Sequence, residues 1–164
     1  MPEFTSILRL KEFLMADELL LNGGSSQANI DEFQRSNGVR IPKDLESYFV
    51  ELNGTNGIYV IGIIRFWGIE EIQRLSKVIP RASLSDDAII QSAYSEPIEN
   101  SNDYFLFADS QYEAQVYAIK LTEAEGLNDV IILTGEKPRI LAKSFSEFVE
   151  LYLNLPERIG VDLN

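Results

Sequence analysis

The residues of this chain that could do chemistry are almost all carboxylates, because the 164-residue sequence contains no histidine and no cysteine. Without these residue types there is no Ser-His-Asp triad, no thiolate nucleophile and no zinc site of the common Cys/His kinds. Two carboxylate pairs remain, Asp86-Asp87 and Glu123/Glu125, and a glycosidase needs two carboxylates across a sugar. Adjacent residues of a strand face opposite ways, however, and no cluster of aromatic residues suggests a sugar platform. We therefore expect no catalytic residues and no enzyme activity.

Patterns that bind phosphate or metal are also missing from the sequence. Neither GxxxxGK[ST] nor GxGxxG occurs, and the glycines at residues 22–26 are more simply explained by a turn between helices. No DxDxDG spacing marks a calcium loop. The sequence thus predicts neither a cofactor nor a metal.

Length and composition predict one globular domain over residues 1–164, with 45% apolar residues. The longest apolar run, residues 58–64, is far shorter than the roughly 20 residues of a membrane-spanning helix. Glu3 lies where a secretion signal would carry basic residues. We expect a cytoplasmic protein without membrane contact, and the absence of cysteine agrees with a reducing compartment.

The elements that would position a site begin with helices. Residues 5–15, about 28–36 and 42–52 carry apolar side chains at three- and four-residue steps, which is typical of helices with one buried face. Pro42 suits the first position of the third helix, and Gly54 suits the left-handed residue that ends it. The β-branched run at residues 58–67 predicts one strand or a close pair. We expect a short helix at residues 69–75, and a long connection over residues 76–100 with a helical turn near residues 88–92.

Strands are predicted again in the C-terminal part of the chain. The expected ranges are residues 103–108, 114–121, 129–133 and 139–142, with a turn at residues 135–138 before the last. Ser144 and Glu147 form a capping box that opens a final helix, and Phe148 and Leu151 lie on its buried face. The predicted fold class is α+β, with N-terminal helices packed on a mainly antiparallel sheet that the C-terminal helix closes.

The order of these signals resembles the SUKH superfamily of bacterial immunity proteins and related fungal cell-wall regulators. The resemblance covers about residues 29–155. It includes a short helix that ends on glycine at residues 29–38 and the stretch NGVRIPKDLESYFVELNG at residues 37–54. It ends with a hydrophobic "Ser-Phe" helix, SFSEFVELYL, in the range 142–155. The chain has Ile41 where the family pattern has leucine, and it lacks the expected glycines after Asp109.

Acidic residues are concentrated in the middle of the sequence. Residues 82–129 hold ten acidic residues and one basic residue, Lys120, and so carry −9 of the net charge of −12. One explanation is a solvated face that aids solubility, and the other is a docking surface for a basic protein. Because nucleic acid is bound by Lys and Arg, the acidic surface argues against nucleic-acid binding. The candidate partner-binding residues are Asp86, Asp87, Tyr94, Glu96, Glu99, Asp109, Tyr112 and Glu113.

The resemblance implies a non-catalytic immunity protein that neutralises a cognate toxin, and the acidic segment is matched to the basic cleft of a nuclease. A regulatory scaffold of the same fold, without a toxin partner, is the alternative. An enzyme with an all-carboxylate site is a distant third hypothesis. Tyr59 and Trp67 are further aromatic residues that could contact a partner, although partial burial in the core is the expected role of Trp67. The sequence gives no prediction of the oligomeric state.

Overall fold

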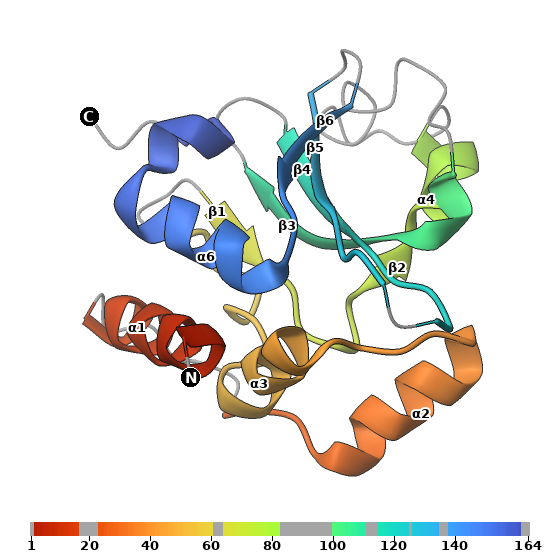
Figure 1. Cartoon of the computed structure of the whole chain (residues 1–164), viewed down its shortest axis with the longest axis horizontal. Helices are drawn as coiled ribbons and strands as arrows, with labels where there is room; N and C mark the ends of the chain where they lie inside the picture. The colour runs from red at the N-terminus through yellow and green to blue at the C-terminus, as the bar shows by residue number, and fades with distance from the viewer. Residues whose placement is uncertain are drawn as a thin grey trace.

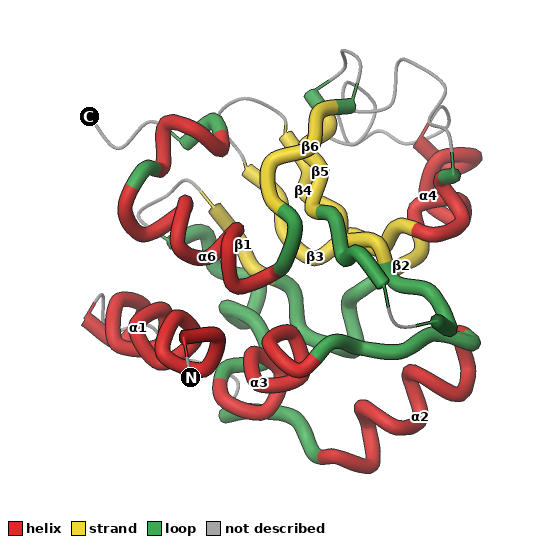
Figure 2. The backbone as a smooth tube through the Cα atoms, viewed as in Figure 1, coloured by secondary structure: helices red, strands yellow, loops and turns green. Residues whose placement is uncertain are grey.

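The structure is a computed structural model that describes residues 2–16, 23–60, 64–82, 100–110, 115–124, 126–134 and 138–161. Helices surround one sheet in this part of the chain, as Figure 1 and Figure 2 show, and the expected α+β class is confirmed. The elements are α1 (Pro2–Ala16), α2 (Gln27–Asn37), α3 (Lys43–Glu51), β1 (Ile64–Phe66), β2 (Gln73–Arg74), α4 (Leu75–Ala82), η1 (Ser101–Asp103), β3 (Tyr104–Ser110), β4 (Gln115–Lys120), β5 (Val130–Leu133), β6 (Arg139–Ala142), α6 (Phe145–Asn154) and η2 (Pro156–Ile159).

The strands form one sheet in the order β1-β3-β4-β5-β6. The short strand β2 also pairs with β3, nearer the start of β3 than β1 does. All of these pairings are antiparallel, in agreement with the predicted sheet. The register places Asp109 of β3 opposite Arg65 of β1, and Tyr104 at the other end of β3 opposite Lys120 of β4. β3 thus connects two distant regions of the molecule.

Hydrophobic side chains fill both faces of the sheet. On one face, α1, α3 and α6 cover an aromatic core in which the Phe107 and Phe148 ring centroids are 5.1 Å apart. On the other face, Leu75 and Val78 of α4 pack with residues of β3, β4 and β5. Neighbouring residues of β3 divide between the two cores, because side chains alternate across a strand. The sheet is therefore a buried middle layer.

The predicted helix signals account for most of the helix ends. The Ser144 hydroxyl accepts from the Glu147 N–H at 3.1 Å, so the predicted cap is confirmed, although the Glu147 carboxylate bonds the Lys143 N–H instead of that of Ser144. α2 ends at Gly38, whose φ of 62° is left-handed. α3 begins one residue after Pro42. None of the described helices combines the length and apolar character needed to cross a membrane.

Residues 55–60 cover the outer edge of β1. The Thr55 N–H donates to the Phe66 carbonyl at 3.0 Å, and Val60 forms a bridge with Ile64. The chain reaches this position through Gly54, which has a φ of 90° and lies so close to Gly68 that an added Cβ would be 2.5 Å from the Gly68 nitrogen. Gly54 is thus required both by its left-handed backbone and by this close approach.

Three sequence expectations differ from the structure or lie outside it. Residues 69–75 were expected to be helical, but Gln73 and Arg74 are a strand, and the helix begins only at Leu75. The extended pairing with β3 outweighs the helical pattern here, because it still buries Ile69 and Ile72. Leu151, which was expected on the buried face of the last helix, is only partly buried. The helical turn expected near residues 88–92 lies outside the described residues.

Candidate functional site

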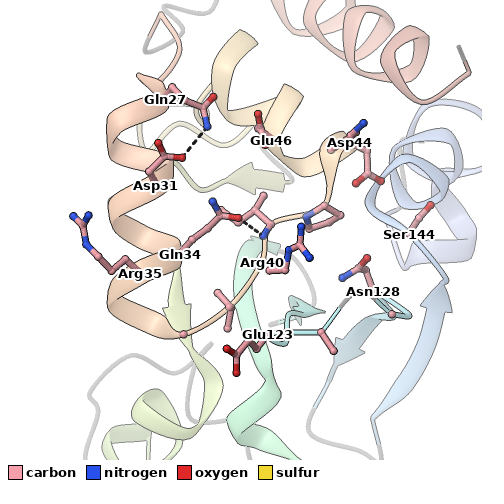
Figure 3. A pocket seen from close by; sticks show the side chains of 17 residues that line it. Gln27, Asp31, Gln34, Arg35, Arg40, Asp44, Glu46, Glu123, Asn128 and Ser144 are labelled. Atoms are coloured by element: carbon pink, nitrogen blue, oxygen red, sulfur yellow. Dashed lines mark hydrogen bonds between the residues drawn. The ribbon is translucent and has the colours of Figure 1, made fainter.

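A wide groove lies between α2 and the connection from β4 to β5. Its walls are α2, the first turn of α3 and residues 123, 124, 126 and 128, and the connection from α2 to α3 at residues 38–42 forms its floor. The cavity volume is about 1150 Å³. Figure 3 shows the side chains that line it, with Ser144 of the β6–α6 connection at one end. Helices and a sheet connection far apart in sequence thus meet around one open space.

The floor of the groove is held by backbone hydrogen bonds to both walls. The Gln34 side chain of α2 accepts from the Ile41 N–H at 2.8 Å. The Arg40 N–H donates to the Thr122 carbonyl at 2.9 Å, which ties the floor to the end of β4. Val39 and Ile41 are both 6% exposed, so their side chains fix the connection to the core below. The backbone between them therefore has a defined position.

Charged side chains of both signs line the groove. Acidic residues come from α2, α3 and the β4–β5 connection, namely Asp31, Glu46 and Glu123, and basic residues are Arg35, Arg40 and Lys43. Asp31 accepts from Gln27 at 3.0 Å, and Arg35 pairs with Glu32 on the same helix. In Figure 3, Arg40 lies between Gln34 of α2 and Asn128 of the opposite wall. The groove thus presents both positively and negatively charged side chains to a binding partner.

The Asp44 carboxylate, at the wall of the groove, has a structural role. It is 5% exposed and accepts hydrogen bonds from the Ser146 N–H at 2.8 Å and the Ser146 hydroxyl at 3.1 Å. Its other oxygen accepts from the Leu45 N–H at 2.8 Å. One carboxylate thus caps the first turns of α3 and α6 together, where the helix dipoles favour negative charge. These bonds leave Asp44 poorly placed to act on a ligand.

The geometry of the groove fits a macromolecule better than a small substrate. Small-molecule pockets usually enclose about 300–1000 Å³ and are lined mainly by apolar side chains. This groove is near the upper end of that range, is open to solvent, and is lined mostly by charged and amide side chains. Within the described residues, no group of three His, Cys, Asp or Glu side chains is arranged to hold a metal ion. The groove is suited to contacts with charged side chains of another protein.

Asp109 is the one predicted site residue that lies within the described part of the chain. It is 3% exposed, which corrects the expectation that it lies at the surface. The reason is the register of the sheet, which places it opposite Arg65, with Arg65 Nε at 2.9 Å and Nη2 at 2.8 Å from its Oδ2 atom. The other predicted partner-binding residues lie outside the described residues, namely Asp86, Asp87, Tyr94, Glu96, Glu99, Tyr112 and Glu113.

Two further donors converge on Asp109. The Trp67 indole Nε1–H donates to Oδ2 at 2.6 Å, and the Tyr59 hydroxyl donates to Oδ1. Trp67 is half-buried and packs against both cores, so the expectation of partial burial is confirmed. Sequence reasoning missed Arg65, although its spacing of two residues from Trp67 within the run predicted as a strand, residues 58–67, was a usable signal. Its pairing with Asp109, 44 residues away, was not readable from the sequence.

Comparison with known proteins places most of this chain within one family. The family model described as "SMI1 / KNR4 family (SUKH-1)" matches residues 24–151. The match begins just before α2 and ends within α6, so it includes the groove and the whole sheet. It leaves out α1. No curated protein matches the sequence significantly.

Proposed function

Because the chain belongs to the SMI1/KNR4 family (SUKH-1), we propose that it is a non-catalytic immunity protein that binds and neutralises a cognate bacterial toxin. The toxin is a basic protein, of the nuclease type, and the immunity protein acts in the cytoplasm of the cell that produces both. Inhibition follows from covering the active site or the substrate groove of the toxin, which needs no chemistry from the inhibitor.

The observation that carries this proposal is the open, charged groove. Its floor is fixed by hydrogen bonds from both walls, so binding costs little ordering of the backbone. Its acidic wall residue Glu123 belongs to the segment of residues 82–129, which carries most of the net charge. A basic toxin would be steered to such a surface, and the mixed charges of the groove would then fix its orientation.

The charge of the molecule supports a protein partner over a nucleic acid. With a net charge of −12, the chain repels phosphate, whereas nuclease domains need basic clefts for their substrates. An acidic inhibitor that occupies such a cleft competes directly with the nucleic acid. We expect the pure chain to give only background rates with nuclease, protease, esterase and glycosidase substrates.

The proposal predicts that a toxin domain is encoded beside the gene of this chain, and the decisive test uses that domain. The wild-type chain should form a complex with the purified toxin domain and abolish its nuclease activity at a one-to-one ratio. Reversing charge in the groove with Glu46→Lys and Glu123→Lys should slow association at low salt. The control is Glu12→Lys on α1, an exposed acid away from the groove, which should bind like the wild type.

Two outcomes would contradict the proposed function, and a third would contradict the groove as its contact surface. If the wild-type chain neither binds nor inhibits the neighbouring toxin, the immunity function is wrong. If affinity capture from the native cell, followed by mass spectrometry, instead yields several stable partners without toxin activity, the regulatory scaffold becomes the better explanation. Equal association rates for the groove variants and the wild type would show that the toxin contacts a surface other than the groove.

A further inference from the structure

A second cluster of interaction-prone side chains lies at the other end of β3 from the groove. It consists of Tyr59, Arg65, Trp67 and Asp109 and is called the arginine cluster below. The Arg65 guanidinium carbon lies 5.1 Å from the centroid of the Tyr59 ring and 5.9 Å from that of Trp67. Both distances are within the range of cation–π contacts. The guanidinium is therefore held by two aromatic rings as well as by a carboxylate.

Burial within the arginine cluster decreases from its base to its rim. Asp109 is 3% exposed at the base, whereas the Arg65 side chain is 32% exposed. Tyr59 and Trp67 are half-buried. Burial by itself would lower the pKa of Arg65, but its hydrogen bonds to Asp109 and the charge of that carboxylate raise the pKa overall. The base is thus a fixed ion pair, and the rim is a partly exposed set of rings around a permanent cation.

The guanidinium keeps one edge for a partner. Arginine has five N–H donors, and Asp109 takes those on Nε and one on Nη2. The opposite edge, formed by Nη1 and the second N–H of Nη2, makes no hydrogen bond to any residue that the structure describes. The parallel N–H groups of Nη1 and Nη2 can bind the two oxygens of one carboxylate at the same time.

The residue types of the arginine cluster and the fixed conformation of Arg65 suit an anchor at a protein interface. Tryptophan, tyrosine and arginine are the types most enriched among residues that dominate binding energy. Here Asp109 and the rings fix the Arg65 side chain before any partner arrives, so little conformational entropy is lost on binding. A purely internal ion pair between β1 and β3 would need Asp109 and Arg65 alone. It would not require two half-exposed aromatic rings stacked on the cation.

We propose that the arginine cluster is a second contact site for the toxin partner, at which a toxin carboxylate binds the free edge of Arg65 between Tyr59 and Trp67. This inference rests on the proposed immunity function and adds a specificity-determining contact to it. β3 spans about 20 Å between this site and the end of the strand nearer the groove, so the arginine cluster is a contact separate from the groove. A basic toxin would then be steered by the acidic surface and recognised by one of its own carboxylates.

The test uses Trp67, which is the only tryptophan of the chain. Protein labelled with 5-fluorotryptophan gives a single ¹⁹F resonance, which is followed during titration with the unlabelled toxin domain that the proposed function predicts beside the gene. We expect the resonance to shift on binding. Arg65→Lys keeps the charge but loses the fork, and it should weaken binding by about 30-fold, mainly through faster dissociation. The matched control is Arg158→Lys in η2, which is exposed and should bind like the wild type.

A second pair of variants distinguishes a role of the arginine cluster in binding from a purely structural role. Trp67→Phe keeps a ring beside Arg65, and Asp109→Asn, at the positioning residue, keeps the shape of the base. Both should weaken toxin binding at a temperature at which each variant is still folded, and binding is measured here by inhibition of the toxin because Trp67→Phe removes the ¹⁹F probe. If all three variants bind as tightly as the wild type while the wild type inhibits the toxin, the inference is wrong and the immunity function stands. If the wild type binds no toxin, both fail. A Trp67 resonance that moves with protein concentration alone would indicate self-association and would also overturn the inference.

Discussion

At the scale of single residues, Asp109 has the largest expected effect on stability among the carboxylates described. Asp109→Ala removes the acceptor of the Arg65 guanidinium and of the Trp67 N–H. We expect a loss of about 2 to 4 kcal/mol in the free energy of unfolding, somewhat less than for a fully buried pair because Arg65 is partly exposed. Urea denaturation measures this loss, with exposed Glu123→Ala as the control. Equal midpoints for the two variants would show that the arginine cluster contributes little to the fold.

The same residue shows what the sequence could and could not predict about the site. Asp109 follows the apolar stretch of β3, and a polar residue there is typically exposed, so the sequence predicts a surface position for it. Burial of an acid depends on its partners, and those come from β1 and from the segment that covers β1. The groove was missed for a related reason. The Arg40–Thr122 hydrogen bond brings residues 38–42 beside the end of β4, and no local sequence pattern predicts that bond.

At the scale of elements, the aromatic core between the sheet and its helices determines stability. Phe49 of α3 and Phe148 of α6 are both fully buried, as the helical patterns predicted. Replacing either one with alanine leaves a cavity, and we expect it to cost about 3 to 5 kcal/mol. Val50→Ala is the control, because Val50 is on α3 next to Phe49 but 43% exposed. Thermal melts of the three variants are sufficient, and unchanged melting of both phenylalanine variants would contradict the packing described.

The docking of α1 should depend on pH through Glu150. The Ser6 hydroxyl and Arg9 both donate to its carboxylate, and the Ser6 hydrogen bond is the largest cause that lowers the pKa of Glu150. A carboxyl with a lowered pKa in the folded state stabilises the protein above its unfolded pKa of about 4.3 and stops doing so as the pH falls through the folded value. Glu150→Gln should therefore be less stable than the wild type at neutral pH, and the two should converge in acid. A constant difference in melting temperature at all pH values would contradict this.

The elements themselves were largely readable from local signals. Helix ends at Gly38 and Ser144 follow from backbone conformation and capping, which are set by one or two residues. The expected helix at residues 69–75 failed because strand pairing is a tertiary effect. β2 has only two residues, and pairing with Leu106 and Phe105 of β3 extends them against the helical pattern. Local propensity is too weak to decide such short segments.

At the scale of the whole molecule, the uneven charge should control how fast the partner arrives. Reversing charge at Asp86, Asp87 and Glu113 together should slow association with the toxin at low salt and flatten its dependence on ionic strength. The reason is that long-range steering is screened beyond about 8 Å at physiological salt. Reversal at Glu3, Glu12 and Glu157 changes the net charge equally outside the acidic segment and is the control. If both triple variants associate at the same rate, net charge alone matters and the segment only aids solubility.

If Tyr94 or Tyr112 is an anchor for the proposed partner, truncating it should change the dissociation rate and not the association rate. Tyr94→Ala or Tyr112→Ala should leave association nearly unchanged and speed dissociation, with a loss of about 2 kcal/mol or more in binding free energy if either side chain is a hot spot. Binding kinetics at several salt concentrations separate this effect from that of the charge variants. Association slowed as much as in the triple variant would contradict the assignment of these tyrosines as anchors.

The hydrogen bonds between Asp44 and Ser146 also constrain when the chain can finish folding during its synthesis. The two residues are 102 positions apart, and a ribosome that adds about 5 to 20 residues per second needs about 5 to 20 s to make the segment between them. During that interval α3 exists without the helix that shares its cap, and the rings of Tyr48 and Phe107 have no α6 to cover them. The protein can therefore complete its fold only after α6 has left the ribosome. A polypeptide that ends before residue 145 should therefore aggregate and should yield no folded, active protein in the cell.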